Sequence, residues 1–117
     1  AIVTEGLLNY FPTPAVEGMW RRFAQTLSGF SHGLYLSDLH LGADNQGLGV
    51  AVFTRLLSSF VRGRVFLHYG DKQQGIDALR WAGFASAQLD HPEPQMSANG
   101  RMDRRGASLV RVIRAET

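Results

Sequence analysis

Apolar and polar positions follow two different periods along the chain, so strands and helices are predicted in turn. Ile2, Val3 and Thr4 form a short apolar strand at the start. A helix is predicted from Thr13-Pro14, an N-cap and a proline at the first helical position, to Gly29. Its apolar residues recur at helical spacing: Val16, Met19, Trp20, Phe23 and Leu27.

The middle of the chain predicts a strand, a loop and a second helix. Residues 33–39 are short, apolar and aromatic, which is typical of a strand, and residues 42–47 are loop-like. The second helix ends at Gly63 and has a broad apolar stripe of Val52, Phe53, Leu56, Leu57 and Phe60. Residues 64–69 could be a strand of the sheet or an extended edge segment, and the sequence leaves both open.

The last third predicts one helix and two strands. Asp71 and Gln74 have capping-box spacing, so a helix is expected over 72–82, with Ile76, Leu79 and Ala82 inward and Gly83 as its end. Strands are expected over 85–90 and 108–115, separated by a loop over 91–106. Because no helix lies between these strands, one should pair antiparallel in an α/β sheet covered by helices.

Composition limits the chain to an ordinary globular domain. Its 117 residues are 44% hydrophobic and 19% charged, which suffices for one core. The absence of Cys excludes disulfides and thiolate zinc sites. No apolar run approaches the ~20 residues that span a bilayer, and no export signal is seen. We therefore expect a cytoplasmic protein that has no membrane contact.

The charge pattern does not favour nucleic acid as a partner. The formal net charge is +2, although several arginines lie close to the end of the chain: Arg101, Arg104, Arg105, Arg111 and Arg114. Aromatic residues are not interleaved with them, so a solvated loop and strand face is expected.

The first residues resemble a methyltransferase signature. Glu5-Gly6-Leu7-Leu8-Asn9-Tyr10-Phe11 is similar to the strand-end motif of the leucine carboxyl methyltransferase-like family of S-adenosylmethionine-dependent O-methyltransferases. Trp81-Ala82-Gly83-Phe84, the strand after it and the terminal 109–113 segment are similar to the C-terminal half of that family. Asn9 stands where Met is frequent.

The resemblance implies a single partial domain, residues 1–117, that is the C-terminal half of a seven-stranded class I (Rossmann-like) methyltransferase sheet with an antiparallel last strand. The family's Gly-rich cofactor loop would precede Ala1. Gly47-Leu48-Gly49 does not replace it, because that stretch follows a loop and is better explained as a helix entry. The chain alone is therefore expected to be inactive.

The resemblance also assigns roles at the candidate site. It implies S-adenosylmethionine as cofactor, contacted by Glu5 and Gly6, and a substrate side formed by Asn9, Tyr10 and Asp38. The acceptor would be a carboxyl or hydroxyl oxygen of a small molecule or a protein terminus. From the residues alone, Glu5 follows a strand, where open α/β sheets place ligands. A surface carboxylate for Glu5 and a packed aromatic for Tyr10 remain open.

A second reading of the sequence is a calcineurin-like metallophosphoesterase fragment. Asp38-Leu39-His40 resembles the first metal motif of that family, and His68-Tyr69-Gly70-Asp71 resembles its next element. A two-metal site needs about six or more ligands, and the remaining motifs are missing. Asp71 is better explained as an N-cap, and we expect no bound metal.

A third reading is a non-catalytic assembly module. Strand 2–4 would leave an apolar edge without a partner, and such an edge favours pairing with another chain. We expect self-association, or pairing with an N-terminal half of the domain, through this strand.

Overall fold

Four strands form one mixed sheet in the computed structural model, which describes residues 1–42, 66–92 and 110–117. The strand order is β1-β2-β4-β3, with β1 parallel to β2 and β4 antiparallel to both of its neighbours. The strands are β1 (Ile2–Thr4), β2 (Leu34–Leu39), β3 (Ser86–Asp90) and β4 (Arg111–Glu116). The predicted antiparallel pairing of the last two strands is confirmed. The described sheet has four strands, and the seven-stranded sheet expected from the resemblance is not shown.

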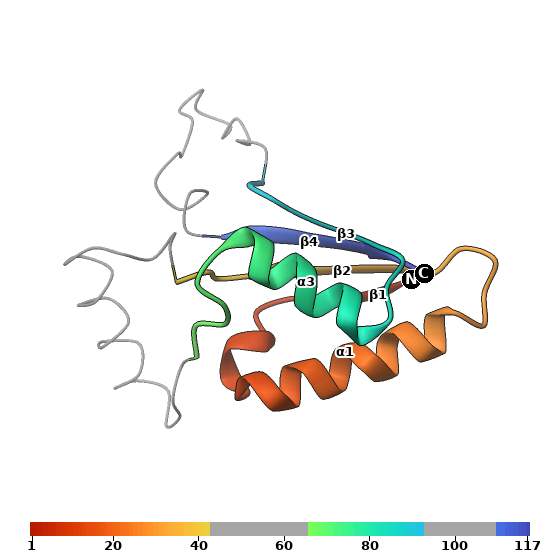
Figure 1. Ribbon diagram of the computed structural model, residues 1–117, viewed down its shortest axis with the longest axis horizontal. Helices are drawn as coiled ribbons and strands as arrows, with labels where there is room; N and C mark the ends of the chain where they lie inside the picture. Colours follow the sequence, from red (N-terminus) through yellow and green to blue (C-terminus); the bar gives the residue numbers. More distant parts are fainter. Residues whose placement is uncertain (43–65, 93–109) are drawn as a thin grey trace.

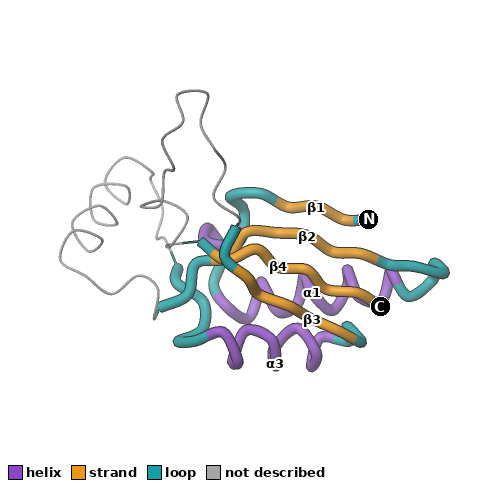
Figure 2. The backbone as a smooth tube through the Cα atoms, turned by 90° about the horizontal axis from the view of Figure 1, so that it is seen from above, coloured by secondary structure: helices purple, strands orange, loops and turns teal. Residues whose placement is uncertain are grey.

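Among the described elements, two helices cover one face of the sheet, α1 (Thr13–Leu27) and α3 (Lys72–Ala82), as Figures 1 and 2 show. The apolar stripe predicted for the first helix faces the sheet: Val16, Trp20 and Leu27 are buried, and Met19 and Phe23 are partly buried against the core. Ala24, which was not part of the predicted stripe, is buried as well. Burying one such Val or Leu side chain contributes about 1.5–3 kcal/mol. Within the described segments, no helix is long and apolar enough to cross a membrane.

The strands present alternate residues to the helices, as half-buried strands do. In β2 the inward residues are Tyr35, Ser37 and Leu39, all of them buried. The Tyr35 ring packs between Phe23 of α1, at 5.4 Å between ring centroids, and Phe84 after α3, at 5.8 Å. This aromatic cluster joins both helices to the centre of the sheet.

The ends of α3 agree with the sequence prediction. The Asp71 carboxylate accepts a hydrogen bond of 2.9 Å from the backbone N–H of Gln74, and Gly83 is the C-cap. The Gln74 side chain accepts a hydrogen bond of 2.9 Å from the backbone N–H of Gly70. In a capping box the donor would be the backbone N–H of the N-cap residue, Asp71, one residue later.

The prediction for the start of α1 was wrong by one residue. Pro12 occupies the N-cap position and no side chain caps the helix. Thr13 is the first helical residue, and its hydroxyl is hydrogen-bonded to His68, 3.0 Å away. A tertiary partner has therefore taken the hydroxyl that local capping would use.

Residues 66–69 do not form a strand. The backbone of Tyr69 has φ 62°, a left-handed conformation that ends the extended segment. The predicted loop after Gly42, the second helix and Gly63 lie outside the described residues. So do residues 64–65, Gly47-Leu48-Gly49, the loop from residue 93 and the first residues of the last predicted strand.

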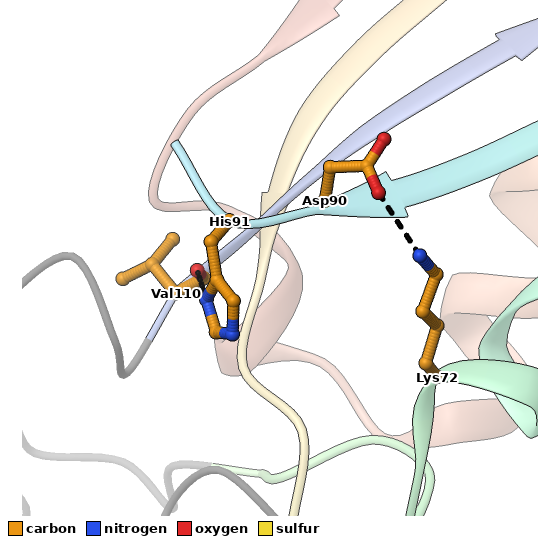
Figure 3. Close-up of polar contacts among 4 residues, drawn as sticks. All are labelled: Lys72, Asp90, His91 and Val110. Atoms are coloured by element: carbon orange, nitrogen blue, oxygen red, sulfur yellow. Dashed lines mark hydrogen bonds and ion pairs between the residues drawn. The ribbon is translucent and has the colours of Figure 1, made fainter. Parts of the chain in front are cut away.

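Two polar contacts join the end of β3 to its neighbours (Figure 3). Lys72 Nζ at the start of α3 lies 2.9 Å from Asp90 Oδ1. The ring of His91 donates from Nδ1 to the carbonyl oxygen of Val110, at 3.4 Å, just before β4. The ion pair is exposed, so its contribution to stability is small, about 0–1 kcal/mol.

Candidate functional site

The candidate site lies where β1 and β2 end side by side. The two strands are parallel, and Thr4 at the end of β1 pairs with Ser37. Glu5 and Asp38 therefore follow directly at the same edge of the sheet, where α/β sheets place their ligands. Glu5 is exposed and Asp38 is half-buried. The structure thus brings together two residues that are 33 positions apart.

Gly6 and Asp38 are joined directly. The backbone N–H of Gly6 donates to Asp38 Oδ1 at 2.8 Å. Gly6 has φ +60°, which a residue with a side chain rarely adopts. The Asp38 carboxylate therefore fixes the turn that follows Glu5, at the carboxyl ends of β1 and β2.

A chain of hydrogen bonds beneath these residues fixes the ends of both strands. Trp20 Nε1 donates to the Tyr35 hydroxyl at 3.2 Å, and the Thr4 hydroxyl donates to Ser37 Oγ at 2.7 Å. Since the Thr4 proton is used in that bond, the Tyr35 hydroxyl must donate to Thr4 Oγ1, 2.9 Å away. Helix α1, β1 and β2 are thereby connected one residue before Glu5 and Asp38.

Asn9 and Tyr10 lie on a short 3₁₀ turn, η1 (Leu8–Tyr10), beyond Gly6. Tyr10 is 51% exposed, so it is not a packed core aromatic. Asn9 Oδ1 is buried and has no hydrogen-bond partner in the described structure. An acceptor in that state fits a ligand with an N–H or O–H group, because an unsatisfied buried polar atom costs about 1–3 kcal/mol.

His68 holds this turn in place. Its side chain is fully buried, and Nε2 lies 2.8 Å from the Leu8 carbonyl oxygen, which can only accept. Nε2 therefore carries the proton, and Nδ1 accepts from the Thr13 hydroxyl. The backbone N–H of Phe66 also donates to the Asn9 carbonyl oxygen at 2.8 Å. The segment before α3 thus supports the turn that carries Asn9 and Tyr10.

Sequence reasoning missed both of these supports. Tyr35, Ser37 and Thr4 were assigned only to strands, and His68 only to a phosphoesterase-like motif. The one available signal was a histidine and a serine at positions that alternate with apolar residues, where a buried polar side chain needs a partner.

The phosphoesterase reading gains no support from the described residues. Asp38 Oδ1 accepts from Gly6, and the Asp71 carboxylate caps α3. Among the described residues, no group of three or more His, Cys, Asp or Glu side chains could hold a metal ion.

Tyr69, which lies against α1 in the helix layer, has a shifted pKa. Burial raises the pKa of the Tyr69 phenol, and the adjacent Glu17 carboxylate raises it further by charge and by accepting its hydrogen bond at 3.2 Å. The Tyr69 ring also stacks on Trp20, with 5.8 Å between the ring centroids. Tyr69 therefore stays protonated and fixes Glu17.

Comparison with known proteins shows the fold alone. No protein-family model and no curated protein matches the sequence. The chain is similar to several solved structures, and two of them match 98% of it. One is a candidate exported protein from Bordetella parapertussis, with 17% identity and a TM-score of 0.60. The other is a candidate O-methyltransferase from Nostoc punctiforme PCC 73102, with 14% identity and a TM-score of 0.56. The chain spans 37% and 30% of their respective lengths.

Proposed function

We propose that the chain is the C-terminal part of an S-adenosylmethionine-dependent O-methyltransferase. The observation that carries the proposal is the convergence of Glu5, Gly6 and Asp38 at the carboxyl ends of two parallel strands. The structural likeness to a candidate O-methyltransferase supports it at the level of the fold. A mixed sheet whose last strand is antiparallel is also what the C-terminal half of a seven-stranded methyltransferase sheet would provide.

Each residue of the site has a role in this proposal. The exposed carboxylate of Glu5 would face the cationic methionine portion of the cofactor, and the backbone of Gly6 would approach it closely. Tyr10, Asn9 and Asp38 would form the acceptor side. The Asn9 Oδ1 atom, which is buried without a partner, would accept a hydrogen bond from the bound molecule.

These residues suit a reaction that needs alignment more than a covalent protein nucleophile. S-Adenosylmethionine, when bound, would supply a methyl group from its sulfonium to a carboxyl or hydroxyl oxygen of the acceptor. Orientation and electrostatics are the main contributions that a protein makes to such a displacement. The acceptor would be a small molecule or a protein terminus, and the enzyme would act in the cytoplasm.

The proposal places the Gly-rich cofactor loop on another part of the gene product, on the β1 side of the sheet. Strand β1 is at the sheet edge among the described strands, where further strands can pair with it. The 117-residue chain is then expected to be inactive by itself.

Calorimetry with S-adenosylhomocysteine on the complete gene product tests the proposal. We expect binding heat from the unchanged protein and about a tenfold loss of affinity in Glu5→Ala, because the ammonium group that S-adenosylhomocysteine shares with the cofactor would lose its carboxylate partner.

Glu116→Ala is the matched control. Glu116 is a partly exposed glutamate at the end of β4, opposite Leu34 at the start of β2, and it is therefore at the other end of the sheet. The Glu116→Ala variant should bind S-adenosylhomocysteine with the same affinity as the unchanged protein. Equal affinity of Glu5→Ala and Glu116→Ala, or no binding heat from the complete protein, would refute the proposal.

A further inference from the structure

A groove of about 530 Å³ lies between α1 and α3, separate from the candidate site. Glu17 and Arg21 of α1 form one wall, and α3 forms the other with Gln74, Asp77, Ala78, Trp81 and Ala82. Tyr69 lies at the end where α3 begins. None of these residues belongs to the group formed by Glu5, Gly6, Asn9, Tyr10 and Asp38.

The groove exposes an aromatic surface. Trp81 is 89% exposed, which is unusual for the largest apolar side chain in a helix. The alanines at positions 78 and 82 are partly buried beside it and leave room next to the indole. This side of α3 is therefore apolar, accessible and wide enough for a small organic molecule.

Carboxylates dominate the charge of the groove. Glu17 and Asp77 are acidic, and Arg21 is the basic residue among the lining side chains. The Arg21 guanidinium is 67% exposed and lies 3.9 Å from Glu17, so this pair is weak and open to exchange. The Tyr69 hydroxyl donates to Glu17 Oε1, and the Gln73 amide donates to Asp77 Oδ1 at 2.8 Å. Both carboxylates are thus oriented by neutral donors, and only the weak contact with Arg21 offsets the charge of Glu17.

We propose that this groove binds a small organic cation with an apolar body, such as a quaternary or aryl ammonium compound. The indole face of Trp81 would contact the cation through its ring electrons, and Glu17 and Asp77 would neutralise its charge. An anionic ligand is disfavoured by the same two carboxylates. This inference does not depend on methyl transfer, because no residue of the groove belongs to that site.

Nitrogen–proton NMR titration of the 117-residue chain tests the proposal. The probes are benzyltrimethylammonium, neutral benzyl alcohol and anionic benzoate, which share the aromatic ring and differ in charge. We expect benzyltrimethylammonium to bind tightest of the three and to shift the amide signals of Gln74, Ala78 and Ala82. Raising the NaCl concentration should weaken this binding.

Variants separate the aromatic and ionic contributions. Trp81→Ala should weaken benzyltrimethylammonium binding about twofold to fivefold, the usual range for one cation–π contact. The double variant Glu17→Gln with Asp77→Asn should remove the preference over benzyl alcohol. Matched controls are Phe30→Ala, an aromatic that is 66% exposed elsewhere, and Asp90→Asn, an exposed carboxylate on β3.

Three results would overturn the proposal. The first is that benzyl alcohol or benzoate binds as tightly as benzyltrimethylammonium. The second is that the shifted amide signals lie outside the groove. The third is that Trp81→Ala and Phe30→Ala bind benzyltrimethylammonium with equal affinity. The dispersed NMR spectrum of each variant verifies that it is folded, so weaker binding cannot be mistaken for unfolding.

Discussion

His68 makes two hydrogen bonds from a side chain that is fully buried. His68→Leu keeps the volume roughly equal but leaves the Leu8 carbonyl and the Thr13 hydroxyl without this partner. We expect the free energy of unfolding to fall by about 1–3 kcal/mol, the cost of buried polar groups without partners. Urea denaturation should show a lower midpoint with an unchanged slope.

The exposed loop histidine His32 provides the control for this change. His32→Leu should alter the free energy of unfolding by no more than about 0.5 kcal/mol, as surface substitutions usually do. If both leucine variants unfold at the same urea concentration, the His68 bonds do not stabilise the turn that carries Asn9 and Tyr10.

Tyr69 makes stability depend on pH in the alkaline range. Burial and Glu17 raise its pKa in the folded chain, while in the unfolded chain the phenol ionises near pH 10. Above about pH 10 the unfolded state therefore binds fewer protons, and stability falls as the pH rises. Tyr69→Phe should show a shallower fall between pH 9 and 11 in urea denaturation, and an identical slope would contradict this assignment.

At the scale of elements, the packing of α1 onto β2 depends on a glycine. A Cβ atom at Gly33, just before β2, would lie 2.7 Å from the Leu27 carbonyl oxygen and 2.6 Å from Leu27 Cβ. Because the carbonyl is part of the backbone, this contact cannot be relieved by a rotamer change. We expect Gly33→Ala to lower the free energy of unfolding by about 1–3 kcal/mol.

Gly18 in the middle of α1 offers the opposite case. Apart from its chain neighbours and the backbone of its own helix, a Cβ atom there would meet no heavy atom within 4 Å. Gly18→Ala should raise the free energy of unfolding by up to about 1 kcal/mol, because alanine favours the helix. Thermal unfolding of the two variants side by side measures both effects, and shifts of the same sign would show that this account of α1 and β2 is incorrect.

The elements that the sequence predicted well are those with a local signal. The apolar stripe of α1, and Asp71 and Gly83 at the ends of α3, act within one or two helical turns. The N-cap of α1 was predicted one residue too late, at Thr13, whose hydroxyl binds His68, 55 residues away. For residues 66–69 the sequence left a strand and an extended segment open, and His68 there binds the Leu8 carbonyl, 60 residues away. Tertiary contacts of this kind leave no periodic pattern in the sequence.

The candidate site follows the same division. That Glu5 and Asp38 follow the same ends of neighbouring strands could be predicted, since parallel strands end at one side of a sheet. That Asp38 binds the Gly6 backbone, and that Trp20, Tyr35, Thr4 and Ser37 connect beneath them, could not. Those bonds depend on the relative rotation of a helix and two strands, which only the packed core determines.

At the scale of the whole molecule, the two faces of the sheet differ in how the described helices cover them. Both described helices lie on one face of the sheet (Figure 2). On the strands, the residues that alternate with the buried ones include Val3, which is 66% exposed, and Val112, which is 38% exposed. Val3 also lies on β1, the edge strand of the described sheet, beside Leu36. An apolar residue on an edge strand favours pairing with another chain.

This arrangement predicts that the 117-residue chain associates with itself through β1. Light scattering over increasing protein concentration should show a rising mass for the unchanged chain, and Val3→Lys should shift that rise to higher concentration, because a lysine on an edge strand opposes strand pairing. Phe30→Lys is the matched control, since Phe30 is equally exposed, at 66%, but lies in the loop between α1 and β2. A monomeric mass at every concentration, or an equal effect of both lysines, would mean that β1 is not the associating edge.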